Sequence, residues 1–148
     1  MPVTDEQVAT LRAQLQGKLE EHRRLLRELD PAEANVGYSA LIAAAFIEAA
    51  ERRFIRDGKV ADKGEVVDFV AQVRETDDEM PDIIDPQIAE SMILHLLGKG
   101  EMVEASEDLK LGHQIVIIAT LVSESQFTEA ELDSFLADAR SLADELLE

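Results

Sequence analysis

The sequence predicts an all-α protein, a bundle of six helices in a single domain that spans residues 1–148. Three observations support this class. Apolar residues recur at helical spacing, helix-start signals precede most of these runs, and no strand with a visible pairing partner is present. The apolar fraction of 46% is ordinary for a chain with its own core. In order, the predicted helices span residues 4–29, 38–56, 63–76, 86–97, 107–123 and 129–147.

The first predicted helix begins with a capping box formed by Thr4 and Gln7, and it ends before Pro31. Gly17 interrupts its helical pattern at a cost of about 1 kcal/mol. Two interpretations of this long helix stay open: it packs along the rest of the bundle, or it forms a homodimer through a short coiled-coil seam. That seam would repeat every seven residues, at Val8, Leu15, His22 and Leu29.

The next three helices have clear boundary signals. The second is rich in alanine, which lets a neighbouring helix pack closely, and Asp57 and Gly58 form its stop signal. The third begins after the capping residue Asp62. The fourth begins with Asp85 as its cap and Pro86 in its first turn, a strong start for a helix.

The last two helices differ in how clearly the sequence marks them. The fifth contains residues 115–122, which are apolar on every side, so we expect it to be the most buried element. A buried strand is the other interpretation of this β-branched run. The sixth begins with a second capping box, Thr128 and Glu131, and carries a clean apolar stripe.

The two halves of the chain, residues 1–76 and 85–148, resemble each other. One interpretation is a duplicated three-helix unit, and the other is a chance match between amphipathic helices made from few residue types. Three matches occur in the same order: residues 5–9 with 85–89, 51–54 with 124–127, and 69–74 with 135–140.

Charge is the strongest functional signal in the sequence. The net charge is −18, and it is unevenly distributed: residues 1–56 carry 8 cations and 9 anions, whereas residues 57–148 carry 6 cations and 23 anions. Such a surface repels nucleic-acid phosphates and anionic lipids, so we expect neither as a partner. It favours instead a basic protein that docks on the acidic second half.

Several other classes of function are disfavoured. There are no cysteines, which removes disulfides and thiolate chemistry. No apolar stretch reaches the length of about 18–20 residues that a membrane span needs, and we expect a cytoplasmic protein. None of the three histidines has a glutamate three residues before it, and no phosphate-binding glycine loop, dinucleotide fingerprint or nucleophile motif is present. We therefore predict no metal, no cofactor and no catalytic residue, and enzymatic activity is the less favoured interpretation.

The candidate binding residues fall into two groups. Two arginine trios occupy the last turns of the first and second helices, where cations also stabilise a helix end. They could form a positive patch that docks on an acidic surface of another protein or of a second copy. The alternative function is a small-molecule or metal site between the second, fourth and fifth helices, where two histidines would meet Glu48 or Glu90. The candidates are Arg23, Arg24, Arg27, Arg52, Arg53, Arg56, His95 and His113.

Four stretches resemble a group of small all-helical actinobacterial proteins without a known activity. The resemblance spans most of the chain and implies an all-helical fold without implying a reaction or a ligand. The stretches are residues 37–46 (GYSALIAAAF), 51–54 (ERRF), 84–86 (IDP) and 96–98 (LLG).

Overall fold

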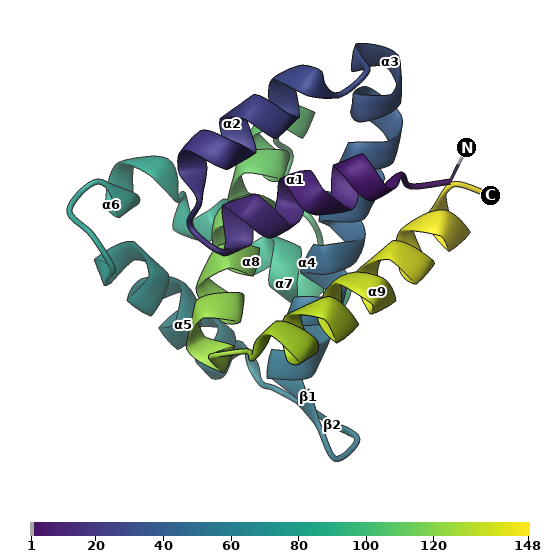
Figure 1. Cartoon of the computed structure of the whole chain (residues 1–148). Helices are drawn as coiled ribbons and strands as arrows, with labels where there is room; N and C mark the ends of the chain where they lie inside the picture. The colour runs from purple at the N-terminus through teal and green to yellow at the C-terminus, as the bar shows by residue number, and fades with distance from the viewer. Residues whose placement is uncertain (1) are drawn as a thin grey trace.

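The computed structural model describes residues 2–148, apart from the side chains of residues 33–35. It confirms the all-α class, because within residues 2–148 only one two-stranded hairpin interrupts the helices (Figure 1). The predicted count of six helices is wrong, since the first predicted helix divides into two and short helical turns form within the predicted connections. The elements are α1 (Asp5–Leu15), α2 (Leu19–Glu28), α3 (Pro31–Glu33), the π-helical turn η1 (Ala34–Tyr38), α4 (Ser39–Phe54), β1 (Ile55–Arg56), β2 (Lys59–Val60), α5 (Lys63–Glu75), α6 (Met80–Ile83), α7 (Pro86–Leu96), α8 (Glu107–Ser125) and α9 (Glu129–Leu146).

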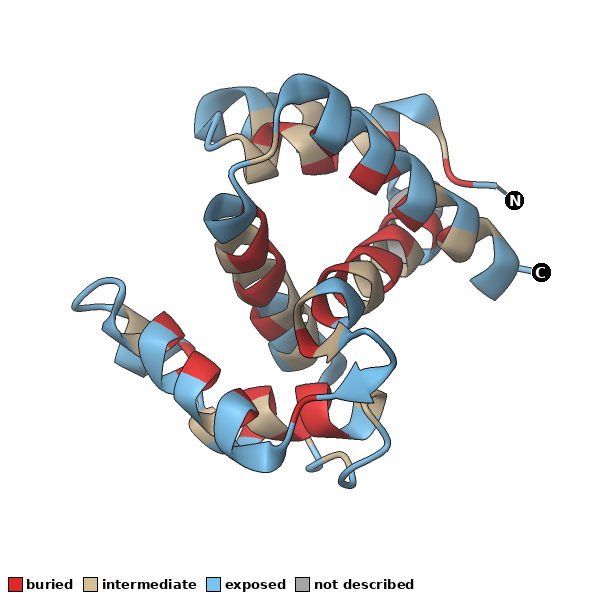
Figure 2. Cartoon of the chain, turned by 90° about the horizontal axis from the view of Figure 1, so that it is seen from below, coloured by how far each residue is buried: buried red, intermediate tan, exposed pale blue. Residues whose placement is uncertain are grey.

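Helix α4 is the centre of the fold. Both α8 and α9 pack along it, and α1 lies across the same face (Figure 1). Eight of its sixteen residues are buried, a larger share than in α8, which the sequence predicted to be the most buried element. Alanines at 44, 45, 49 and 50 are almost fully enclosed, so neighbouring helices can approach its backbone closely. Figure 2 shows the buried residues gathered on the faces that the helices turn toward each other.

The long first helix predicted over residues 4–29 is in fact two helices. Gly17 adopts a left-handed conformation (φ 75°) after α1, and the amide of Lys18 donates to the carbonyl of Ala13 at 2.9 Å, which closes a Schellman-type end. The chain then reverses into α2, whose His22 Nδ1 lies 2.8 Å from the carbonyl oxygen of Thr10. The predicted seven-residue seam is therefore wrong, and its apolar residues pack against the core instead.

The second predicted helix, residues 38–56, also ends earlier than expected. It ends at Phe54, and Asp57 and Gly58 form the tip of a hairpin in which Ile55 pairs with Val60. Both tip residues have positive φ, 52° and 76°, which is the Asp-Gly turn that joins two short antiparallel strands. The stop signal was correct, but it is followed by a hairpin that leads directly into α5.

The predicted start signals are confirmed. Both capping boxes form, Thr4 with Gln7 and Thr128 with Glu131, and the side chains of Asp62 and Asp85 accept hydrogen bonds from the first turns of α5 and α7. Residues 115–122 lie within α8, so the alternative of a strand is wrong. No helix within residues 2–148 is long and apolar enough to cross a membrane.

Phenylalanines from the matched segments of the two halves form two similar pairs. Phe54, at the end of α4, contacts Phe69 of α5 with ring centroids 5.4 Å apart. Phe127, just after α8, contacts Phe135 of α9 at 5.7 Å. Each pair holds a helix against the helix that follows it. The duplication of the two halves stays a prediction. These two phenylalanine pairs are the structural feature that the halves share at the matched positions.

Candidate functional site

A cleft of about 230 Å³ opens where the ends of α4 and α8 meet the start of α9. Three arginines line it: Arg52 and Arg53 come from the last turn of α4, and Arg56 comes from β1. The sequence singled out this trio, and the fold brings all three side chains to one place. We call this feature the arginine cleft.

The other wall of the arginine cleft is apolar. Leu121 and Val122 of α8 are buried, and so is Phe135 of α9, while Phe127 is half-buried beside them. The sequence placed these residues only in apolar helix stripes. They lie far along the chain from Arg56, so no local pattern could show that they share a cleft with the arginines.

Arg52 is held in place by neighbours on three sides. Its guanidinium donates to Asp138 of α9 at 2.8 Å, lies 3.8 Å from Glu48 and stacks over the ring of Phe135 at 5.2 Å. Partial burial raises the pKa of Glu48, and the positive charge of Arg52 opposes that rise. Arg52 therefore connects α4 to α9, and its charge is largely balanced within the chain.

Arg53 and Arg56 have no ion-pair partner among the described residues, although the chain contains 32 carboxylates. The guanidinium carbon of Arg53 lies 5.0 Å from the ring centroid of Phe54 and 5.9 Å from that of Phe69. This cation–π stacking fixes the guanidinium group without satisfying its charge by an anion. Arg56 is exposed at the start of the hairpin.

The second arginine trio lies elsewhere. Arg23, Arg24 and Arg27 are exposed on α2, a helix without a buried residue, and α2 and the hairpin lie at opposite ends of the view in Figure 1. Arg24 pairs with Glu28 one turn along the same helix at 3.4 Å. The groove along this trio also contains Glu20 and Glu21, so its charges are mixed.

The two candidate histidines do not form a pocket with each other. His113 is 2% exposed; its Nδ1 donates to the carbonyl of Leu109 at 2.8 Å, and its Nε2 accepts from the amide of Asp85 at 3.0 Å. Both nitrogens are therefore used within the fold: Nδ1 bonds one turn back along α8, and Nε2 joins α8 to the start of α7. His95 is exposed on α7. The cleft described above lies between α4, α8 and α9, rather than between α4, α7 and α8, and neither histidine lines it.

Carboxylates and histidines do not gather into a metal site in the part of the chain that the structure describes. Within residues 2–148, side chains of 33–35 excepted, no group of three or more His, Asp or Glu side chains is close enough to hold a metal ion. The many acids are spread over helix surfaces, where solvent separates them.

Two classes of acids differ in their partners, and the first class, like Glu20, Glu21, Glu145 and Glu148 elsewhere in the chain, makes no ion pair with a described residue. Helices α5, α6 and α7 with their connections, residues 62–96, carry ten acids and two cations; we call this segment the acidic lobe. Nine of these acids are exposed, Glu90 is half-buried, and none makes an ion pair with a described residue. Arg74, one of the two cations, donates to the carbonyl of Ile84.

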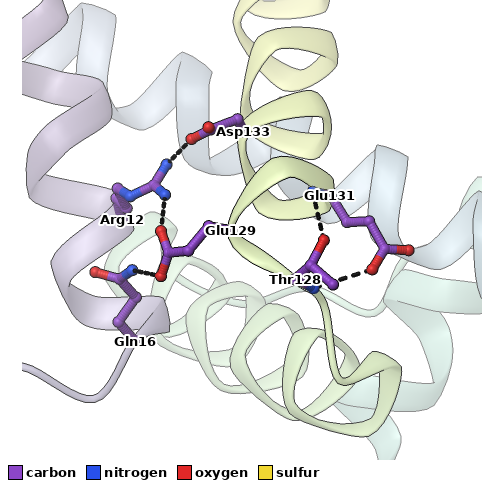
Figure 3. Close-up of polar contacts among 6 residues, drawn as sticks. All are labelled: Arg12, Gln16, Thr128, Glu129, Glu131 and Asp133. Atoms are coloured by element: carbon purple, nitrogen blue, oxygen red, sulfur yellow. Dashed lines mark hydrogen bonds and ion pairs between the residues drawn. The ribbon is translucent and has the colours of Figure 1, made fainter.

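The second class of acids, on α9, is tied to cations of the body. Arg12 of α1 contacts both Glu129 and Asp133, and its distance to Glu129 is 2.6 Å (Figure 3). Its hydrogen bond to Glu129 is the main influence that raises the pKa of Arg12. Arg140 reaches back to Asp5 at 2.7 Å. These acids hold α1 against α9, whereas those of the acidic lobe have no such structural use.

We compared the chain with models of known protein families, with curated proteins and with solved structures. None of the three comparisons finds a match.

Proposed function

We propose that this protein is a binding module whose acidic lobe docks on a basic protein partner. The observation that supports the proposal is that none of the ten acids of the lobe makes an ion pair with a described residue. Three of them, Asp62, Asp77 and Asp85, accept hydrogen bonds from backbone amides only. Glu129 and Asp133 differ from them, because both pair with Arg12 and help to hold α1 against α9. A surface of unpaired like charges lowers the stability of the free protein and speeds the approach of a partner of opposite charge.

The lobe also offers apolar surface among its charges. Ile83, at the end of α6, is 48% exposed, and Asp82 and Asp85 flank it in the sequence. Protein interfaces commonly combine an apolar centre with a charged rim. Basic side chains of the partner would contact the carboxylates, while an apolar group of the partner would cover Ile83. The exposed Ile83 among exposed acids supports this mode of binding.

The arrangement of the fold supports separate roles for the lobe and the body. In Figure 1, α5 and α6 lie to one side of the helices α1, α4 and α9, and both chain ends lie on the opposite side. The lobe is anchored by Phe69 against Phe54 and by His113 against the backbone of Asp85. Its outer surface is therefore available for contact without rearrangement of the core.

The test uses two variants with the same change in net charge. The lobe variant neutralises four exposed acids next to α6 and leaves the cap residue Asp85 intact. The control variant neutralises four exposed acids on α2 and at the chain end, none of which makes an ion pair with a described residue. The lobe variant is Asp77→Asn, Asp78→Asn, Glu79→Gln and Asp82→Asn; the control variant is Glu20→Gln, Glu21→Gln, Glu145→Gln and Glu148→Gln.

Each protein is immobilised and exposed to lysate of the cells that produce it, and retained proteins are quantified by mass spectrometry. We expect a basic protein that the wild type and the control variant retain equally, and that the lobe variant binds about tenfold more weakly, a loss of ~1.4 kcal/mol. Equal losses in both variants would show that net charge, rather than the lobe, governs retention. That result would leave the acids as a solubility feature and contradict the proposal.

A further inference from the structure

We propose that the arginine cleft is a second, separate binding site, which takes a small organic carboxylate with an apolar body about the size of one ring. Its carboxylate would meet Arg53 and Arg56, and its body would lie against Phe127. This site lies outside the acidic lobe and has the opposite charge preference.

The charges of the cleft favour an anion with a single charge. Arg52 is balanced by Asp138 and Glu48, neither of which lines the cleft, and Glu124 is the carboxylate among the described residues that line it. Arg53 and Arg56 together exceed Glu124 by one positive charge. A guanidinium group offers paired N–H donors that match the two oxygens of a carboxylate.

The surrounding helix ends disfavour a phosphate dianion. Both α4 and α8 end at the cleft, and the carbonyl end of a helix carries partial negative charge. The start of α9 is nearby, but Thr128 and Glu131 already use its capping positions. Phosphate sites commonly use free amides at a helix N-terminus. Residues 128–131, the first turn of α9 with its cap, do not line the cleft, so it offers a phosphate no such amide.

The apolar wall determines the rest of the ligand. Phe127 is half-buried, and its ring lies against Phe135, so one face of the cleft is aromatic. Leu121 and Val122 continue this surface. A cavity of about 150 Å³ is enough to hold benzene, so the cleft of about 230 Å³ has room for one ring and a carboxylate. Burial of such a ring supplies the affinity that a single exposed charge pair lacks.

Stacking of Arg53 prepares the site before a ligand arrives. Its guanidinium is already fixed against Phe54 and Phe69. Little side-chain entropy is therefore lost when it binds an anion. Arg56, which has no such contact among the described residues, would order when the ligand binds.

The experiment is a titration of the isotope-labelled full chain, followed by NMR, with three probes. Phenylacetate has the ring and the carboxylate, benzyl alcohol has a similar ring without the charge, and inorganic phosphate has charge without a ring. We expect phenylacetate to shift the resonances of Arg53, Arg56 and Phe127 with millimolar affinity. Benzyl alcohol and phosphate should bind at least tenfold more weakly.

Three variants test the position of the site. Arg56→Gln should weaken phenylacetate binding about tenfold, whereas Arg23→Gln, the same change on α2, should leave it unaltered. Ser125→Phe, which places a ring in the cleft without removing an arginine, should abolish binding. Unchanged binding in Arg56→Gln, equal binding of benzyl alcohol or phosphate, or the absence of shifts at the cleft would each overturn the proposal. Retained melting curves confirm that the variants are folded.

Discussion

Replacement of Gly17 by alanine tests whether residues 4–29 form two helices or one. The substitution should destabilise a chain that breaks at Gly17 and stabilise a continuous helix. Gly17 has a φ of 75°, and a Cβ built there meets no atom within 4 Å. The cost of Gly17→Ala is therefore backbone strain alone, about 1–2 kcal/mol for an L-residue in the left-handed region. Alanine also restricts the unfolded chain, which returns about 0.4–1 kcal/mol. We expect a net loss of about 1 kcal/mol.

The assay is thermal and urea unfolding of the purified protein, with Gly112→Ala as the control. Gly112 lies inside α8, and a Cβ there also meets no atom within 4 Å. Gly112→Ala should stabilise the protein by about 1 kcal/mol, the difference between the two residues in a helix interior. The two variants should melt on opposite sides of the wild type, each displaced by about 2–4 °C. Stabilisation by Gly17→Ala would show that residues 4–29 form one helix and would refute the break.

Three further predictions concern single buried or half-buried groups. The hydroxyl of Tyr38 is buried without a hydrogen-bond partner among the described residues, so Tyr38→Phe should leave stability unchanged or raise it by about 1 kcal/mol; a marked loss in urea unfolding would reveal a partner. His113→Phe removes the acceptor of the Asp85 amide and should lower the free energy of unfolding by about 1–3 kcal/mol. An unchanged unfolding midpoint would show that this hydrogen bond does not stabilise the fold. Burial raises the pKa of Glu48 in the folded protein above its value in the unfolded chain. Ionisation of Glu48 therefore lowers the stability of the fold as pH rises from the unfolded pKa through the folded pKa. The melting temperature of Glu48→Gln minus that of the wild type should therefore increase from pH 4 to pH 7. A difference that stays constant over this range would contradict the prediction.

Local signals in the sequence were sufficient to predict where α1, α5, α7 and α9 begin, but no side-chain cap marks the starts of α2 and α6. The caps at Thr4, Asp62, Asp85 and Thr128 form because each side chain bonds to amides within its own first turn. Where helices end was less clear. A glycine such as Gly17 fits both a helix interior and a left-handed end, and the seven-residue apolar pattern continued across it.

For the arginine cleft, too, the sequence showed the local cluster but not the residues that packing brings to it. Arg52, Arg53 and Arg56 are neighbours in the sequence, so their cluster was predictable. Phe127 and Val122 reach them only because α8 and α9 pack against α4. The ion pairs of Arg12 with Glu129 and Asp133 likewise form between segments that are distant in the sequence. The sequence alone therefore could not show which acids are paired.

In the proposed function, the carboxylates of the acidic lobe contact a basic partner. The most direct test is carboxyl footprinting: the protein is labelled by a carbodiimide and an amine, alone and with the lysate fraction that contains the retained partner. Mass spectrometry then gives the labelling of each acid. We predict protection of Asp77, Asp78 and Asp82, with Glu145 and Glu148 labelled as in the free protein. Equal protection of both groups, or of neither, would contradict the claim.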